Sequence, residues 1–73
     1  MTNLLKLNRP RSEWEHLIDE WIIGANSERN RKLVKRRLLD GVRFEPLAEE
    51  FDLSVQRTKD IFYECVKTLS KHA

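Results

Sequence analysis

Apolar residues recur at helical spacing near the start of the chain, and this periodicity limits the fold more than any other feature. The residues at positions i, i+3, i+4, i+7 and i+8 are Trp14, Leu17, Ile18, Trp21 and Ile22. Such spacing is typical of one buried helix face. Ser12 and Glu15 stand at the spacing of a capping box, so Ser12 is predicted to be the N-cap of this helix. Gly24 is expected to end it.

Two further helices are expected in the middle of the chain. Ser27 is predicted to cap a helix that runs to Asp40 and stops at Gly41. Pro46 suits the first turn of a short third helix, because proline lacks the amide hydrogen that would be unpaired there.

A tight turn and a long helix complete the pattern. Asp52 is expected in the turn, since aspartate tolerates the left-handed conformation better than most residues, and Ser54 is predicted to cap the helix that follows. The inward face of that helix, residues 55 to about 71, consists of Thr58, Ile61, Phe62, Cys65, Val66 and Leu69. The predicted fold class is therefore all-α: a small four-helix domain.

The length sets the domain organisation, because 73 residues enclose only one hydrophobic core. Residues 12–73 are predicted to form a single helical domain after an N-terminal arm of residues 1–11. Arg9 and Arg11 in this arm either reach a DNA minor groove or belong to a frayed terminus. No run approaches the roughly 20 apolar residues of a membrane span, and the start does not read as a signal peptide. We expect a soluble, cytoplasmic protein.

The residues that most often carry chemistry are scattered. A single cysteine, Cys65, excludes an internal disulfide, and it makes no ligand set with His16 and His72, which lie far apart in the sequence. We therefore expect no metal, no cofactor and no catalysis. Cys65 is expected to lie in the core, and His16 and His72 are expected to face solvent. Trp14 and Trp21 are predicted to anchor the core, the alternative being an exposed aromatic patch for a partner.

Positive charge is concentrated in the second helix. Fourteen basic and twelve acidic residues give a net charge of only +2, yet the span from Arg29 to Arg37 contains six bases and no acid. Cations grouped on one surface attract phosphates whatever the net charge, which favours a DNA-binding function. The alternative is an ordinary solvated basic helix balanced by the acidic ones.

The segment FEPLAEEFDLSVQRTKDI, residues 44–61, places a short helix, a tight turn and a capped longer helix in succession, as in a helix-turn-helix. Ala48 is small where the two helices would cross closely. Residues 44–69 resemble region 4 of bacterial sigma-70 factors, and the preceding arginine-rich helix with Gly41 resembles the helix that opens that region. The resemblance covers about residues 27–70. It looks closest to small stand-alone regulators of phages and mobile elements, such as late-gene activators of the ArpU type.

The resemblance implies a DNA-binding transcription regulator with a helix-turn-helix at residues 44–71, whose helix beginning at Ser54 enters the major groove. Base contacts are implied for Val55, Gln56, Lys59 and Asp60. Phosphate contacts are expected from Arg31, Lys32, Lys35, Arg36, Arg43, Ser54, Arg57 and Tyr63. Double-stranded DNA is the expected partner, and RNA polymerase or a second copy of the chain would add the contacts that one small module lacks.

Several residues differ from the family pattern. Asp52, Thr58 and Pro46 stand where the family has glycine, isoleucine or valine, and glutamate. Val55 offers only apolar contact, for example to a thymine methyl, and Asp60 only an acceptor for a donor such as cytosine N4. The sequence specificity is therefore not inherited from the family. The alternative function is a helix-turn-helix scaffold used as a protein-interaction module, an inhibitor or adaptor of a phage or host, without DNA reading.

Overall fold

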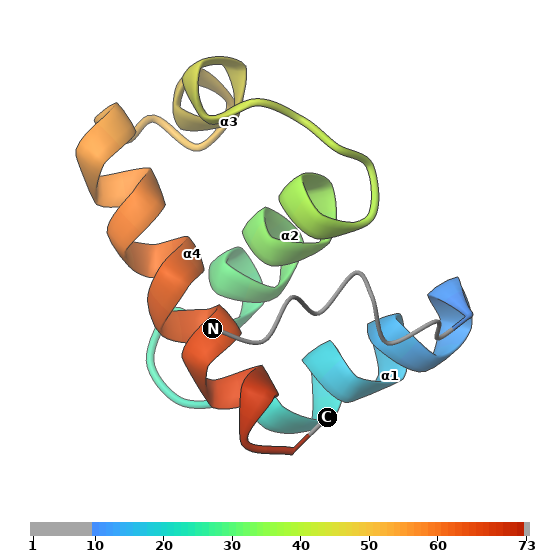
Figure 1. Cartoon of the computed structure of the whole chain (residues 1–73). Coiled ribbons are helices and arrows are strands. Elements are labelled where there is room, and N and C mark those ends of the chain that lie inside the picture. The colour runs from blue at the N-terminus through green and yellow to red at the C-terminus, as the bar shows by residue number, and fades with distance from the viewer. Residues whose placement is uncertain (1–9, 73) are drawn as a thin grey trace.

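The computed structural model describes residues 10–72, and within them it contains helices and no strands, which confirms the all-α prediction. The helices are α1 (Arg11–Trp21), α2 (Ser27–Leu38), α3 (Phe44–Glu50) and α4 (Val55–Ser70). Figure 1 shows α3 and α1 at opposite ends of the molecule, with α2 between them. The longest helix, α4, packs against all three others. Most of the predicted arm, including Arg9, lies outside the described residues.

The start of α1 differs from the prediction. The helix begins at Arg11, and Pro10 is its N-cap, with no side-chain hydrogen bond at the cap. The carbonyl of Pro10 accepts from the amides of Glu13 and Trp14 at 3.1 and 3.2 Å. Ser12 therefore lies inside the first turn and is not the cap. The backbone of Pro10, at φ −59° and ψ 152°, is still extended, as at an N-cap, and helical conformation begins at Arg11, so the capping box of Ser12 and Glu15 is not used.

The connection between α1 and α2 also corrects a predicted cap. Asn26, not Ser27, is the N-cap of α2, and its backbone is left-handed with φ 61°. Its carbonyl accepts from the amide of Asn30 at 2.9 Å, which places Ser27 in the first turn. The helix before it ends at Trp21, three residues before Gly24, whose φ of 97° turns the chain. Asparagine is one of the few residues other than glycine that adopt this conformation readily.

The turn between α3 and α4 matches the prediction closely. Asp52 is left-handed with φ 55°, and its amide donates to Glu49 O at 3.2 Å while that of Leu53 donates to Ala48 O at 2.9 Å. These two bonds form the Schellman motif, which satisfies the free carbonyls at the end of α3. Ser54 caps α4 as predicted, since its Oγ accepts from the amide of Arg57 at 3.0 Å.

The core is assembled from the predicted apolar faces of all the helices. Its buried hydrophobic residues are Trp14, Leu17, Ile18, Ile22, Leu33, Val34, Leu47, Ala48, Ile61, Phe62, Cys65 and Leu69. Trp14 is a core anchor, whereas Trp21 is half-buried and stacks on the exposed ring of His72, with centroids 3.5 Å apart. Cys65 is buried as expected, and burial raises the pKa of its thiol.

The buried threonine of α4 keeps its hydroxyl paired. Thr58 is fully buried, and its Oγ1 donates to the carbonyl of Ser54 at 2.8 Å. A buried hydroxyl without a partner would destabilise the fold. The bond back to the preceding turn is therefore what allows threonine at a position of the core where an aliphatic residue would be usual.

Substitution of two of the three predicted capping serines should distinguish the one that caps its helix from one that does not. Ser54→Ala removes the acceptor for the amide of Arg57 and should lower the free energy of unfolding by about 1 kcal/mol. Ser12→Ala removes an exposed hydroxyl in the first turn of α1 and should change it by less than about 0.5 kcal/mol. Urea unfolding followed by circular dichroism measures both, and equal losses would contradict the assigned caps.

Candidate nucleic-acid interface

The cations of α2 hold the helices together. Arg31 donates from Nε to the carbonyl of Ile22 at 2.7 Å and so satisfies a backbone acceptor just after α1. The ammonium of Lys35 lies 2.8 Å from a carboxylate oxygen of Asp19, which joins α2 to α1. Both side chains were predicted to contact phosphate, and in the structure both bind to groups of the protein itself.

Arg36 is the centre of an ionic network between three helices. Its guanidinium contacts both carboxylate oxygens of Glu50 in α3, with the shortest distance 3.0 Å, and Asp40 at 3.3 Å. Arg11 at the start of α1 contacts the same aspartate at 2.8 Å. The guanidinium of Arg11 holds the pKa of Asp40 below its usual value, and Glu50 raises the pKa of Arg36.

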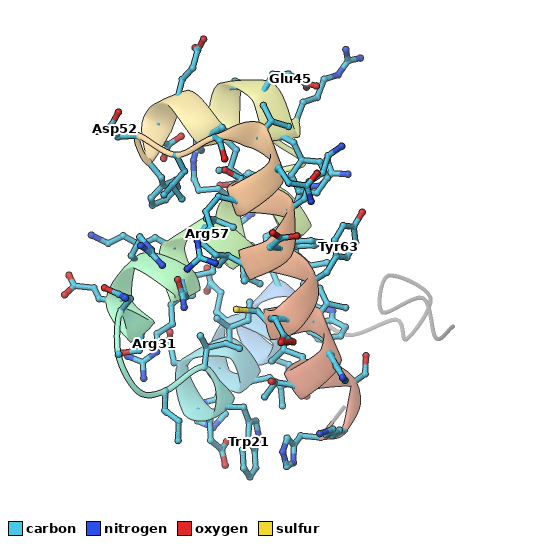
Figure 2. All side chains as sticks on the ribbon, turned by 90° about the vertical axis from the view of Figure 1, so that its left-hand side faces the viewer. Trp21, Arg31, Glu45, Asp52, Arg57 and Tyr63 are labelled. Atoms are coloured by element: carbon cyan, nitrogen blue, oxygen red, sulfur yellow. The ribbon has the colours of Figure 1, made fainter. Side chains whose placement is uncertain are left out.

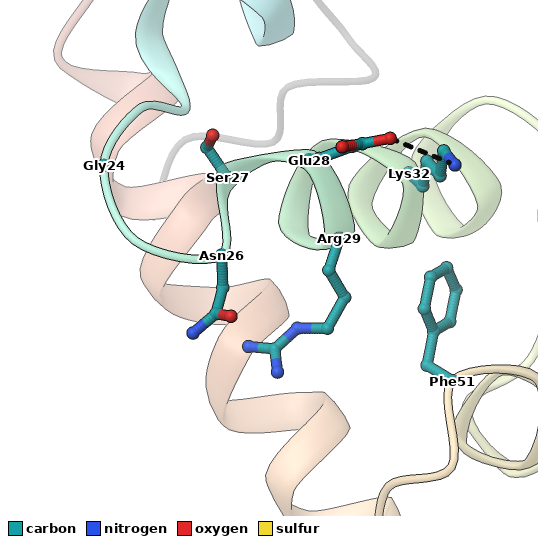
Figure 3. A pocket seen from close by; sticks show the side chains of 7 residues that line it. All are labelled: Gly24, Asn26, Ser27, Glu28, Arg29, Lys32 and Phe51. Atoms are coloured by element: carbon teal, nitrogen blue, oxygen red, sulfur yellow. Dashed lines mark ion pairs between the residues drawn. The ribbon is translucent and has the colours of Figure 1, made fainter.

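The remaining cations of the basic span are less constrained. Lys32 is exposed and lies 3.6 Å from Glu28, and Arg29 donates to the side chain of its neighbour Asn30. With Phe51 these three charged residues help to line a hollow of about 550 Å³ beside the loop between α1 and α2 (Figure 3). Acidic residues of α1, α2 and α3 thus form ion pairs with three of the six cations of the basic span: Lys32, Lys35 and Arg36.

A different group of cations surrounds an aromatic surface where α3 meets α4. We call it the Phe44 cluster; its members are Arg37, Phe44, Lys59, Phe62 and Tyr63. The guanidinium carbon of Arg37 lies 4.4 Å from the centre of the Phe44 ring, and the ammonium of Lys59 lies 5.7 Å from it. Within residues 10–72 neither cation pairs with an acid. Both charges therefore lie against the same ring, and Arg37 also donates from Nη1 to the carbonyl of Val42 at 3.2 Å.

Tyr63 is the exposed member of the Phe44 cluster. It is 53% exposed, and its ring centre lies 6.0 Å from that of Phe44 and 5.4 Å from that of Phe62. The sequence reasoning did not select Phe44 as a site residue. The spacing of Lys59, Phe62 and Tyr63 at i, i+3 and i+4 was the available signal, but a side chain from α3 completes the surface.

The predicted base-reading residues share the first turns of α4. Gln56 and Asp60 are exposed, and the Nε2 of Gln56 donates to a carboxylate oxygen of Asp60 at 2.9 Å. Lys59 and Val55 are half-buried on the flank beside them. Figure 2 shows Arg57 and Tyr63 on opposite flanks of this helix. The four predicted residues therefore lie close together on α4. Gln56 and Asp60 form an exposed, hydrogen-bonded pair, whereas Val55 and Lys59 are half-buried.

The cations without an acid partner lie on both α2 and α4, and they differ in their other bonds. In the part of the chain that the structure describes, no ion pair involves Arg43, Arg57, Lys59, Lys67 or Lys71, and the ammonium of Lys59 lies over the Phe44 ring. The hydroxyl of Ser54, although it accepts from an amide, keeps its own hydrogen for donation. Within the described residues, the cations whose side chains have neither an ion pair nor a hydrogen bond thus lie on α4, directly after it, or directly before α3, whereas Arg29, Arg31 and Arg37 of α2 keep their charge but donate to neutral acceptors.

Residues 10–72 contain neither a cluster of metal ligands nor a membrane-spanning helix. Within them, no group of three or more histidine, cysteine, aspartate or glutamate side chains could hold a metal ion. No helix there combines the length and the apolar character needed to cross a bilayer. His16 and His72 are both exposed, as the sequence predicted.

Comparison of the chain with protein-family models, with curated proteins and with solved structures finds no match. A functional assignment therefore depends on the geometry of the exposed surface of α4 and its surroundings.

Proposed function

We propose that this protein binds double-stranded DNA and regulates transcription, with α3 and α4 as a helix-turn-helix and α4 in the major groove. The observation that carries the proposal is the position of the uncompensated cations. Arg57 and Lys59 lie in the first turns of α4 and pair with no acid within residues 10–72, and the polar side chains of Gln56 and Asp60 in the same turns are exposed. A major groove accepts one helix and presents base edges to it, while the phosphates on either side require cations on both flanks of that helix.

The two flanks of α4 supply these cations from different elements. In a docked complex, Lys59 and Arg37 of the Phe44 cluster, with Arg43 next to Phe44 in the chain, would face one strand of the duplex. Arg57 extends on the opposite flank of α4 (Figure 2). With its 16 residues, α4 is about 24 Å long, so its first turns can enter the groove while its second half stays packed on α1 and α2.

The partners beyond DNA follow from the resemblance to sigma-70 region 4. One helix-turn-helix makes few contacts, so tight and specific binding requires a second DNA-bound unit or a protein that binds alongside. RNA polymerase is the partner that the resemblance implies, and a homodimer is the other route to sufficient affinity.

A protein-interaction module is the second candidate, and the exposed aromatic surface favours it. Tyr63 presents about half of its surface to solvent beside Phe44 and two cations, a composition that also suits a protein partner. The two candidates differ in their dependence on salt, because only DNA binding releases many counterions from a polyanion.

Binding to a mixed-sequence duplex, measured by fluorescence anisotropy over a range of salt concentrations, tests the proposal. If four or five phosphates are neutralised, the logarithm of the association constant should fall linearly with the logarithm of salt concentration, with a slope of about −4. Affinity that is absent at low salt, or that does not depend on salt, would overturn DNA binding and favour the protein-interaction module.

A further inference from the structure

We propose that Gln56 and Asp60 read DNA as one hydrogen-bonded unit, and that their target is an adenine next to a cytosine on adjacent base pairs. The inference rests on the proposed function, and it adds the sequence that the site would select. The observation behind it is the 2.9 Å bond between the Gln56 amide and the Asp60 carboxylate on the exposed face of α4.

The bond fixes which groups of the two side chains remain for a ligand. One amide hydrogen of Gln56 is used, which leaves the second amide hydrogen and Oε1. A donor beside an acceptor is complementary to the N7 acceptor and N6 donor of adenine. Asp60 keeps acceptor positions only, and in the major groove cytosine N4 is a donor that matches them. The hydrogen-bonding groups that remain are therefore complementary to one adenine, through Gln56, and to one cytosine, through Asp60.

The separation of the two ends of the pair sets the spacing of the two bases. Gln56 and Asp60 lie one helical turn apart, but their polar atoms meet at 2.9 Å. Successive base pairs are about 3.4 Å apart along the duplex. Two polar groups in contact with each other can thus reach neighbouring base pairs and not pairs several steps apart.

The pairing also explains how a carboxylate is tolerated on a face that approaches phosphates. An isolated Asp60 would be repelled by the backbone and would lose water without compensation. A donor from Gln56 on one side and one from cytosine on the other would satisfy its oxygens. Guanine and thymine offer the carboxylate no donor in the major groove, and adenine offers N6 only beside its N7 acceptor, so Asp60 acts against other bases as well as for cytosine.

Selection of bound duplexes from a random pool tests the inference, using the full chain and three variants: Asp60→Asn, Gln56→Ala and Glu64→Gln. Wild-type protein should enrich adenine beside cytosine. Asp60→Asn should lose at least about tenfold of its discrimination for cytosine, and Gln56→Ala should lose a similar factor for adenine. Glu64→Gln is the matched control, because it removes one exposed carboxylate of α4 whose side chain accepts no hydrogen bond within the described residues.

The controls distinguish failure of the paired base readout from failure of DNA binding itself. Removal of a negative charge should strengthen non-specific binding in Asp60→Asn and Glu64→Gln alike, but only the first should change the selected sequence. Enriched sequences that are the same in wild type, Asp60→Asn and Gln56→Ala would overturn the paired readout and leave DNA binding intact. Absence of salt-dependent binding to any duplex would overturn both. Circular dichroism of each variant verifies that these exposed substitutions leave the fold unchanged.

Discussion

Leu33→Ala should lower the free energy of unfolding by about 2 to 5 kcal/mol, the range for removal of a fully buried leucine. The side chain of Leu33 has no exposed surface and belongs to the single hydrophobic core. A chain of 73 residues has a total stability of about 4 to 11 kcal/mol, so the variant would lose a large part of it or unfold outright. Urea unfolding followed by tryptophan fluorescence and circular dichroism measures the loss.

Ile23→Ala is the matched control for this cavity. Ile23 is also a large aliphatic residue, but it is 70% exposed, so its truncation removes little buried surface. We expect a change within about 0.5 kcal/mol. Similar losses in Leu33→Ala and Ile23→Ala would contradict the packing described for α2, because the two residues differ in burial far more than in size.

The Arg57→Ala/Lys59→Ala double variant should bind a mixed duplex about one-hundredfold more weakly than wild type at roughly 50 mM salt. Each cation that neutralises one phosphate contributes close to one unit to the salt dependence and about tenfold to affinity at that concentration. Arg57 lies on the flank of α4 opposite Tyr63 (Figure 2), whereas Lys59 lies over the Phe44 ring, and neither cation is paired with an acid within residues 10–72. The losses of affinity from the two substitutions should therefore add, and the slope of the logarithm of the association constant against the logarithm of salt concentration should become shallower by about two. Salt-dependent anisotropy titrations measure both quantities.

Lys32→Ala removes the same charge from α2 and is the control for this variant. Lys32 is exposed and its ammonium is already 3.6 Å from Glu28, so its loss should alter affinity little. If Lys32→Ala weakened binding as much as Lys59→Ala alone, the attraction would reflect net charge, and α4 would not be the interface. Lys32 would then belong to the phosphate-contacting set that the sequence predicted.

The accuracy of the sequence predictions depended on how local each interaction is. The turn at Asp52 and the cap at Ser54 were correct, because both are settled by residues within a few positions. The caps at Ser12 and Ser27 were wrong although both residues favour that position. The actual N-caps are Pro10, two residues before Ser12, and Asn26, one residue before Ser27, so each serine was left inside the first turn of its helix.

The cations of α2 show where local reasoning stops. Their sequence contains no acid between Arg29 and Arg37, which predicts a continuous positive surface. In the folded chain Lys35 meets Asp19, and Arg36 meets Glu50 of α3. These acids are distant in the sequence, so no window along it could indicate that they meet the cations. The Phe44 cluster is similar, because its central ring comes from α3 and its cations from α2 and α4.

The sequence by itself determined the number of helices, the face that each one buries and the geometry of the turn between α3 and α4, because backbone hydrogen bonds and helical periodicity act over a few residues. Only the tertiary structure decided which charges remain available. An ion pair or a cation–aromatic contact forms where packing brings two side chains within a few ångströms. Packing brought many of the α2 cations into hydrogen bonds and ion pairs within the molecule, whereas the cations on α4 have no acidic partner within the described residues.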